Sequence, residues 1–157
     1  MNAHIEKKPG FKIAGIAVHD GSSSDFSGVW DQLFKKYTME QLDALGSGEP
    51  FGSCYGYKSN DKFSYIAGYD LKNEALAEEL GLDIVDVPDA EYAVLQIHGS
   101  IPDSIRKGWE FMYSHWLAEY GYTHAGTPDF EYYLDGDPND PNYEMQLWVP
   151  VKRTSGE

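Results

Sequence analysis

The sequence repeats itself, and this repeat restricts the fold more than any other feature of the chain. The segment PGFKIAGIAVHDG, from Pro9, aligns without a gap with PDAEYAVLQIHGS, from Pro88, at an offset of 79 residues. Beyond the loop that follows, the same offset relates two aromatic pairs, Trp30 with Trp109 and Phe34 with Tyr113. Self-similarity at a fixed spacing indicates a duplicated folding unit.

Each copy begins with a strand of alternating apolar residues, and a Ser/Gly-containing turn then leads into an amphipathic helix. The first helix is expected to start near Ser24 and Asp25, and its apolar stripe is Phe26, Trp30, Leu33, Phe34 and Tyr37. Thr38 to Gln41 predicts a capping box for a short second helix. The helix of the second copy is predicted to open around Ser100 to Asp103 and to stop at Gly121.

Two strands are predicted after the helices of each copy, at residues 53–57 and 63–69 and at residues 130–134 and 143–149. A helical turn is predicted between the copies at residues 73–80, and an extended segment is predicted at residues 81–87. The order strand-helix-strand-strand predicts an α+β fold with a helix on one sheet face of each copy. We expect a single domain over residues 1–157, with repeat halves at about 9–70 and 88–151. An approximate two-fold axis would leave a ligand groove between the halves.

The alternation near the end of the chain selects candidate binding residues. From residue 143 to 149 the odd positions form an apolar face, which leaves Glu144, Gln146 and Trp148 on the other face. From residue 130 to 134 the even positions are the apolar ones, which leaves Glu131 and Tyr133. Large aromatic side chains are uncommon on a solvated face, so these five residues are predicted to line the groove. The predicted partners are Trp109 and, from the first copy, Tyr55, Tyr57 and Tyr65.

Composition excludes several classes of protein. The formal net charge of −14 repels phosphate backbones and anionic lipid surfaces, so neither direct nucleic-acid binding nor membrane binding is expected. The start of the chain lacks the apolar core of a signal peptide, and no run of residues is long enough to span a bilayer. These features predict a soluble, cytoplasmic protein. The lone Cys54 is expected to be a buried, unreactive thiol.

No metal or cofactor is expected. The loop DGDPND resembles the start of a calcium-binding EF-hand loop, but Asp140 replaces the glycine at position six and Gln146 the glutamate at position twelve. The five histidines show no ligand spacing, and a single cysteine disfavours structural zinc. The run GSGEPFG lacks the spacing that a phosphate-binding loop requires.

Three segments together resemble the GyrI-like small-molecule-binding family, which also supplies the effector-binding domain of some AraC-type and MerR-type transcription regulators. They are YGYKSNDKFSYIAGYDL, PDAEYAVLQIHGSIPDSIRKGWEFMYSHWL, and FEYY followed by QLWVPV. The resemblance covers nearly the whole chain and implies a duplicated strand-helix-strand-strand unit around a central pocket. It also implies a stand-alone member without a DNA-binding domain.

The resemblance further implies a ligand, since family members bind flat, lipophilic and often cationic compounds. An acidic residue commonly lies four positions before the proline of the last strand, and here that position is Gln146. Glu144 and Glu131 are the nearest acidic alternatives. Some relatives protect against toxic compounds, and some resemble hydrolases that add water to the cyclopropane of DNA-alkylating natural products. In that case Glu131 or Glu144 is the expected catalytic base.

Different hypotheses remain for the residues and for the function. Trp109 belongs either to the pocket or to the core, as its counterpart Trp30 would, and both glutamates have a solvated surface as their alternative. The leading hypothesis is binding of a lipophilic aromatic molecule, for sequestration or detoxification, with hydrolysis as an extension. The alternatives are an acidic protein that inhibits DNA gyrase and a ligand sensor that acts on a partner regulator. The sequence specifies no oligomeric state.

Overall fold

A computed structural model describes residues 2–21, 28–58, 60 and 62–154 of the chain. The backbone forms two compact units. Unit 1 comprises residues Met1–Pro9 and Asp89–Glu157, and unit 2 comprises residues Gly10–Pro88. Both units combine helices with antiparallel strands, which confirms the predicted α+β fold class.

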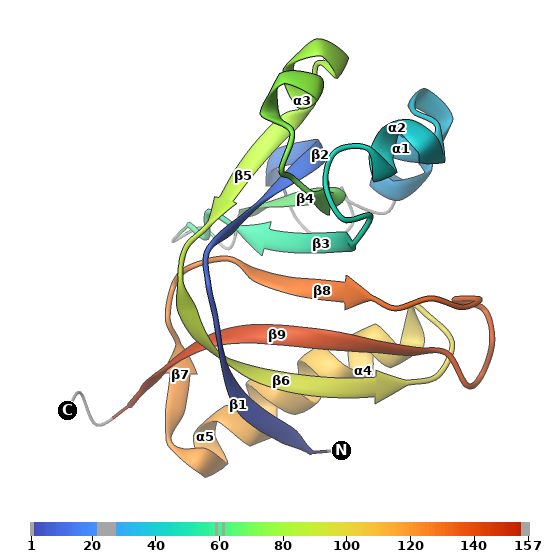
Figure 1. Cartoon of the computed structure of the whole chain (residues 1–157). Coiled ribbons are helices and arrows are strands. Elements are labelled where there is room, and N and C mark those ends of the chain that lie inside the picture. Colours follow the sequence, from blue (N-terminus) through green and yellow to red (C-terminus); the bar gives the residue numbers. More distant parts are fainter. Residues whose placement is uncertain (1, 22–27, 59, 61, 155–157) are drawn as a thin grey trace. The chain divides into compact units, whose positions relative to one another are not determined.

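Unit 2 is an antiparallel sheet in the order β3-β4-β2-β5 with helices on one face (Figure 1). Its buried core joins Ala14 and Tyr69 of the sheet to Leu33 and Leu42 of the helices. The elements in chain order are β2 (Phe11–Gly21), α1 (Val29–Lys36), α2 (Met39–Asp43), β3 (Pro50–Tyr55), β4 (Phe63–Asp70), α3 (Glu74–Leu80) and β5 (Asp83–Val87).

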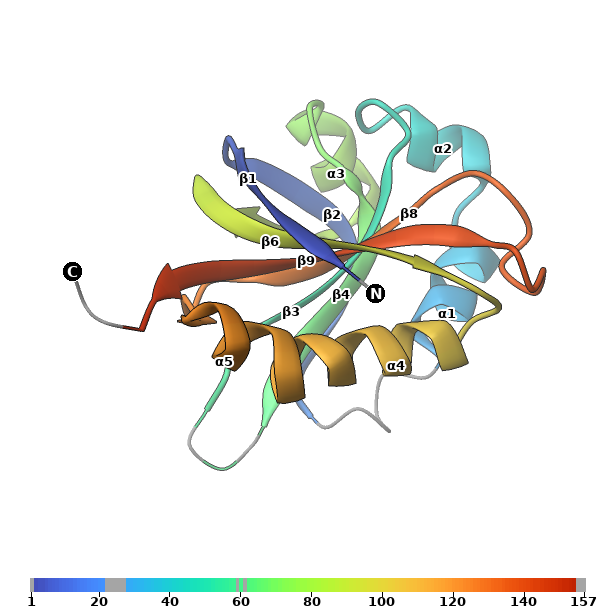
Figure 2. The same cartoon turned by 90° about the horizontal axis from the view of Figure 1, so that it is seen from below.

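Unit 1 has a sheet in the order β1-β6-β9-β8, to which β7 adds by pairing with β9. One long helical segment runs along its sheet (Figure 2), and the segment contains a π turn between two α-helices. The elements are β1 (Ala3–Lys8), β6 (Ala90–His98), α4 (Asp103–Phe111), the π turn η2 (Met112–Trp116), α5 (Leu117–Tyr120), β7 (Tyr122–His124), β8 (Asp129–Tyr133) and β9 (Glu144–Arg153).

The two sheets share one plan, and their outer strands are exchanged between the two copies of the repeat. In unit 1 Lys8 of β1 pairs with Ala90 of β6, and in unit 2 Val87 of β5 pairs with Phe11 of β2. Both pairs are related by the same 79-residue offset, so β1 and β5 are equivalent strands. Each leading strand therefore completes the sheet of the other copy.

The strand β1 was not predicted from the sequence, and its composition explains why. The segment AHIEKK is mostly exposed, with only its two ends partly buried, so it lacks a continuous apolar face. Charged residues on an outer strand also oppose pairing with other chains. The short strand β7 was likewise missed. The repeat therefore extends back to residue 3, beyond the predicted start at Pro9.

The helices agree with the predictions where the structure describes them. Thr38 accepts the Gln41 N–H at 3.1 Å and donates its own N–H to the Gln41 side chain at 2.9 Å, which confirms the capping box. Gly121, in the left-handed conformation, ends the long helical segment as predicted. The prediction that Phe34 is part of the buried apolar stripe is wrong, because this residue is 47% exposed. The predicted helix start at Ser24 and Asp25, and Phe26, lie outside the described residues.

The predicted strands exist with shifted ends. The strand predicted at 53–57 is β3, which begins earlier and stops at Tyr55, because Gly56 turns the chain with a φ of 64°. The strand predicted at 143–149 is β9, which continues to Arg153 beside β7. Within the described ranges, none of the helices is long and apolar enough to cross a membrane.

The strand exchange predicts a local effect of removing β1. In a chain that starts at Pro9, the amides of β6 that face β1 lose their hydrogen-bond partners, so they should exchange with solvent faster. The amides of β2 keep their partner β5 and are the internal control. Hydrogen exchange of peptides from the two strands measures the difference. Equal acceleration in both strands, or none in β6, would contradict the assigned pairing.

Candidate functional site

The face of β8 that carries Glu131 is the face covered by the helix of unit 1. Glu131 pairs with Leu147 of β9, and Tyr133 pairs with Met145. Leu147 and Met145 belong to the core that includes the helical residue Met112. Side chains of directly paired residues lie on the same face of a sheet. Glu131 and Tyr133 therefore point toward the helix, and so does Asp129, which lies two residues before Glu131.

Two aromatic side chains donate hydrogen bonds to the Glu131 carboxylate. Its Oε1 accepts the Tyr133 hydroxyl at 2.8 Å, and its Oε2 accepts the Trp109 indole N–H at 3.4 Å. Glu131 is only 8% exposed. Burial of a carboxylate is costly unless hydrogen bonds satisfy it, and these two donors contribute to that.

The buried carboxylate of Asp129 also binds aromatic side chains. Its Oδ2 accepts the Tyr113 hydroxyl at 2.8 Å and lies 3.2 Å from Nε2 of His124. The other ring nitrogen of His124, Nδ1, accepts the Gly126 backbone N–H at 2.9 Å. This bond assigns the proton of the neutral ring to Nε2, which donates to Asp129.

The aromatic rings above these acids form a row. The Trp109 and Tyr113 ring centroids lie 5.7 Å apart with an angle of 20° between the planes. The Tyr113 and His124 centroids lie 6.1 Å apart at 23°. Every ring of this aromatic row, Trp109, Tyr113 and His124, is thus linked by a hydrogen bond to a carboxylate of β8.

We name this group the helix-side cluster, and its members are Trp109, Tyr113, His124, Asp129, Glu131 and Tyr133. It combines flat ring surfaces with two buried carboxylates on one strand, a pairing suited to aromatic and cationic compounds. Among the described residues, no group of three or more His, Cys, Asp or Glu side chains could hold a metal ion.

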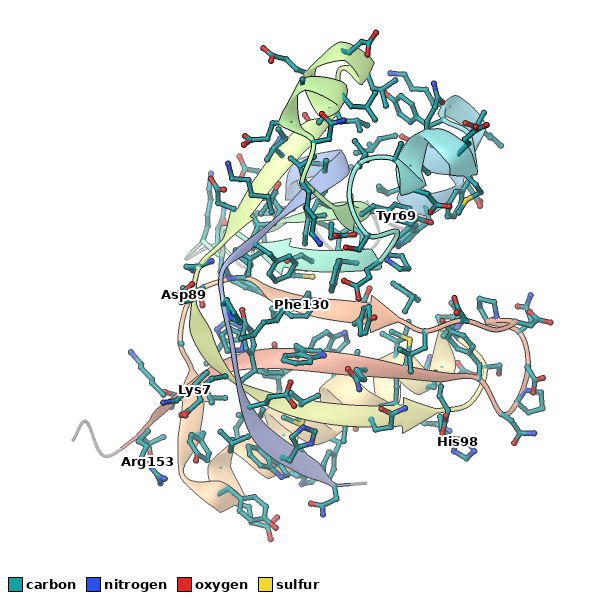
Figure 3. All side chains as sticks on the ribbon, in the orientation of Figure 1. Lys7, Tyr69, Asp89, His98, Phe130 and Arg153 are labelled. Atoms are coloured by element: carbon teal, nitrogen blue, oxygen red, sulfur yellow. The ribbon has the colours of Figure 1, made fainter. Side chains whose placement is uncertain are left out.

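Glu144, Gln146 and Trp148 lie on the opposite face of the same sheet. Trp148 pairs with Phe130, and the two rings stack with centroids 5.4 Å apart. Phe130 lies on β8 (Figure 3). Trp148 donates its N–H to Gln146 at 3.0 Å, and Gln146 donates to Gln96 at 3.1 Å. Glu144 is exposed.

The prediction that all five strand residues share one face is therefore wrong. Glu131 and Tyr133 face the helix, whereas Glu144, Gln146 and Trp148 face away from it. The cause is that both faces of β8 are buried, with Phe130 at 1% and Glu131 at 8% exposed. Alternating hydrophobicity cannot identify the core side of such a strand.

The three tyrosines predicted from the first copy lie in unit 2. Tyr65 of β4 accepts the Trp30 indole N–H at 3.0 Å on the helix-covered face of that unit. Tyr57 is 48% exposed and stacks on Phe63 at 5.4 Å. In the described part of the chain the buried Tyr55 hydroxyl lacks a hydrogen-bond partner, and burial, then Asp83 and Asp20, raises its pKa.

Tyr92 is a titrating group beneath the stacked rings of the opposite face. Its ring lies edge-on to Trp148 at 5.5 Å and is fully buried. Burial, and to a smaller extent the Asp129 charge, raises the pKa of Tyr92 to about 12. The phenol therefore stays neutral near neutral pH and adds no charge to this face.

Sequence reasoning missed three members of the cluster, Tyr113, His124 and Asp129. Two of them follow from spacing rules applied to residues already predicted. Tyr113 is four residues after Trp109 on one helical segment, and Asp129 is two residues before Glu131 on one strand. No comparable signal indicates His124, because β7 contains only three residues.

Comparison with known proteins gives a family and several relatives. A family model described as the GyrI-like small molecule binding domain matches residues 1–152. The transcriptional regulator BrlR of Pseudomonas aeruginosa is 30% identical over 156 residues, which cover 96% of this chain and 56% of that protein. A DNA gyrase inhibitor of Erwinia billingiae is 28% identical over 92 residues, which cover 59% of each chain.

The chain spans little more than half the length of these curated relatives. Among solved structures, that of SAV2435 bound to tetraphenylphosphonium has a TM-score of 0.83 with 21% identity. The match covers 97% of this chain and 94% of that one. At this level of identity the likeness concerns the fold.

The Glu131 hydrogen bonds predict a stability effect. Tyr133→Phe removes one donor from a buried carboxylate, so the free energy of unfolding should fall by about 1 to 3 kcal/mol. Urea denaturation measures the change. Tyr120→Phe, at a tyrosine that is 52% exposed, is the matched control and should change the free energy by less than about 0.5 kcal/mol. Equal effects of the two substitutions would contradict the Glu131 geometry.

Proposed function

The chain belongs to the GyrI-like small molecule binding domain family, and we propose that its helix-side cluster binds flat, lipophilic aromatic compounds and prefers those that carry a positive charge. The observation that carries the proposal is the bonding of Glu131. A nearly buried carboxylate is held by the donor groups of two aromatic side chains, so ring surface and negative charge occur together.

The expected interaction free energies favour a cationic aromatic ligand over a neutral one. Each aromatic pair adds about 0.5 to 1.5 kcal/mol beyond the burial of area. A cation over an indole or phenol face adds about 0.5 to 2 kcal/mol, and the larger value applies where water is excluded. The charge of Glu131 acts on the same ligand through a region of low dielectric constant.

The comparisons supply a probe. SAV2435, which shares the fold, was solved with tetraphenylphosphonium, a lipophilic cation with four flat phenyl rings on a tetrahedral phosphorus. BrlR is a transcriptional regulator, which supports a role in sensing, whereas sequestration and detoxification follow from binding alone. Sensing, sequestration and detoxification all require that the protein binds the compound, so binding is tested first.

We predict that tetraphenylphosphonium quenches the tryptophan fluorescence of the protein and that Glu131→Gln weakens the binding at least about tenfold. A tenfold change corresponds to about 1.4 kcal/mol, which is a modest value for a charge near a buried carboxylate. Trp109→Phe should also weaken binding, because it removes the indole that bonds Glu131. Titration by isothermal calorimetry gives the dissociation constants.

The control for Glu131→Gln is Glu110→Gln, which makes the same change of charge at an exposed residue beside Trp109. The anion tetraphenylborate, which has a similar shape, separates charge from shape. Unaltered affinity in Glu131→Gln, or equal losses in both variants, would overturn the site assignment. Equal affinity for the cation and the anion would overturn the preference for cations.

Hydrolysis is a second candidate, and the contact of 2.8 Å between Glu131 and the Tyr133 hydroxyl favours it. In a cyclopropane conjugated to a dienone, water attacks the strained carbon and Glu131 removes its proton. The carbon–carbon bond breaks, and its electrons reach the dienone oxygen to give a phenolate. The Tyr133 hydroxyl would turn from Glu131 to donate to that oxygen.

This candidate predicts a water adduct of a cyclopropane-bearing alkylating compound, detected by mass spectrometry. Glu131→Gln should abolish its formation, whereas Glu144→Gln, at an exposed residue on the other face, should not. Absence of the adduct with the unmodified protein would remove hydrolysis of this substrate class and leave binding in place.

Inhibition of DNA gyrase is supported only by the relative of that name and by the net charge of −14. A supercoiling assay distinguishes it from ligand binding. Inhibition that disappears with salt but persists in Glu131→Gln would favour a DNA-mimicking surface, because surface charges are screened by ions.

A further inference from the structure

Gly108 brings the helix of unit 1 into close contact with its sheet. It is a buried residue of α4, directly before Trp109 in the chain. A Cβ atom built at this position would lie 2.6 Å from Cδ1 of Leu147 and 2.9 Å from Cγ2 of Ile97, and real Cβ atoms essentially never come so close to another atom. Both of these sheet residues are buried among packed neighbours. A side chain at position 108 would therefore press the helix and the sheet apart.

The contact at Gly108 lies next to the hydrogen bond on which the proposed function depends. Leu147 pairs directly with Glu131, so both side chains lie on the sheet face that the helix covers. Trp109, the next residue of the helix, donates its indole N–H to Glu131 at 3.4 Å. A hydrogen bond of this length is already long, so a small outward shift of the helix would break it.

The other copy of the repeat meets the same packing requirement with the large side chain on the helix. Val29 is the counterpart of Gly108 at the 79-residue offset, and it shares a buried core cluster with Ala67 of β4. Ala67 is equivalent to Leu147, because the two lie opposite equivalent residues of the next strand. Each unit thus combines one small and one larger residue at this contact, valine with alanine in unit 2 and glycine with leucine in unit 1.

In both units the tryptophan that follows this contact bonds the sheet. Trp30, the residue after Val29, donates its indole N–H to Tyr65 at 3.0 Å. In unit 1 the indole N–H of Trp109 donates to Glu131. The acceptors differ, whereas the combination of one small and one larger residue is common to both units. The spacing of helix and sheet at this contact is therefore the feature that brings the indole to its acceptor.

We propose that Gly108 is a positioning residue of the helix-side cluster. Its close contact with Leu147 sets the spacing of helix and sheet, and this spacing holds Trp109 within hydrogen-bond distance of Glu131. The inference rests on the proposed function, because it explains how the ring and the carboxylate of the same site are kept together. A displaced Trp109 separates an aromatic ring from the Glu131 charge, so aromatic cations are the ligands whose binding depends on Gly108.

The test is Gly108→Ala, with two measurements: the dissociation constant for tetraphenylphosphonium and the indole N–H signals of the four tryptophans in a proton–nitrogen NMR spectrum. Trp109→Phe identifies the Trp109 signal by its absence. Alanine forms helix more readily than glycine, so the helix should persist, but the added methyl group should move Trp109 away from Glu131. We expect the Trp109 signal to move upfield and the affinity to fall about threefold or more.

The matched control is Gly28→Ala, the same change at a glycine where an added Cβ atom meets nothing within 4 Å among the described residues beyond its chain neighbours. A second variant combines Gly108→Ala with Leu147→Val, which removes from the sheet about the volume that alanine adds to the helix. This variant should restore both the Trp109 signal and the affinity, because the two positions are in contact. Thermal melting followed by circular dichroism checks that each variant folds.

Unaltered affinity in Gly108→Ala, with Glu131→Gln still weakening the binding, would overturn this inference and leave the proposed function intact. An unmoved Trp109 signal would overturn it as well. If Gly108→Ala alone does not fold, the combined variant decides, and a folded combined variant with a displaced Trp109 signal would count against the inference. Failure of the unmodified protein to bind tetraphenylphosphonium would overturn the proposed function itself.

Discussion

The pairing of β8 with β9 is the constraint on which the candidate site depends. Opposite residues share a face, so the pair formed by Glu131 and Leu147 places the glutamate on the side of the helix. A shift of one residue would turn Glu131 and Asp129 to the other face and bring Phe130 toward Trp109. The carboxylates meet the aromatic row only in the observed register.

The duplicated fold forms a different hydrogen bond at the equivalent tryptophan of each unit. Both units place a tryptophan at the same helical position, and its N–H reaches the sheet in each. Trp30 donates to the Tyr65 hydroxyl, whereas Trp109 donates to the Glu131 carboxylate. At the 79-residue offset Glu131 corresponds to Gly52, which has no side chain to bond. The tryptophan therefore has a carboxylate partner in unit 1 and a hydroxyl partner in unit 2, and the exchanged strands β1 and β5 preserve the common plan.

Much of the fold could be predicted from the sequence, because the repeat, the capping box and the alternation of β9 are local signals. Glu131, Trp109 and Tyr133 were predicted as site residues, and the structure brings them together. The side of the sheet could not be predicted, since Phe130 and Glu131 are both buried. His124 was missed because its contact with Asp129 depends on the pairing of β7 with β9, which no local pattern indicates. The predicted groove between the halves stays a prediction.

The central claim is that ligand binds on the helix-covered face of the unit 1 sheet. A crystal structure of the protein with tetraphenylphosphonium tests it most directly. We expect electron density for a phenyl ring of the ligand against Trp109, with ring centroids about 4.5 to 7 Å apart. Density on the opposite face, against Trp148 and Gln146, would contradict it, because Glu131 would then lie on the wrong side of the sheet to contact the cation.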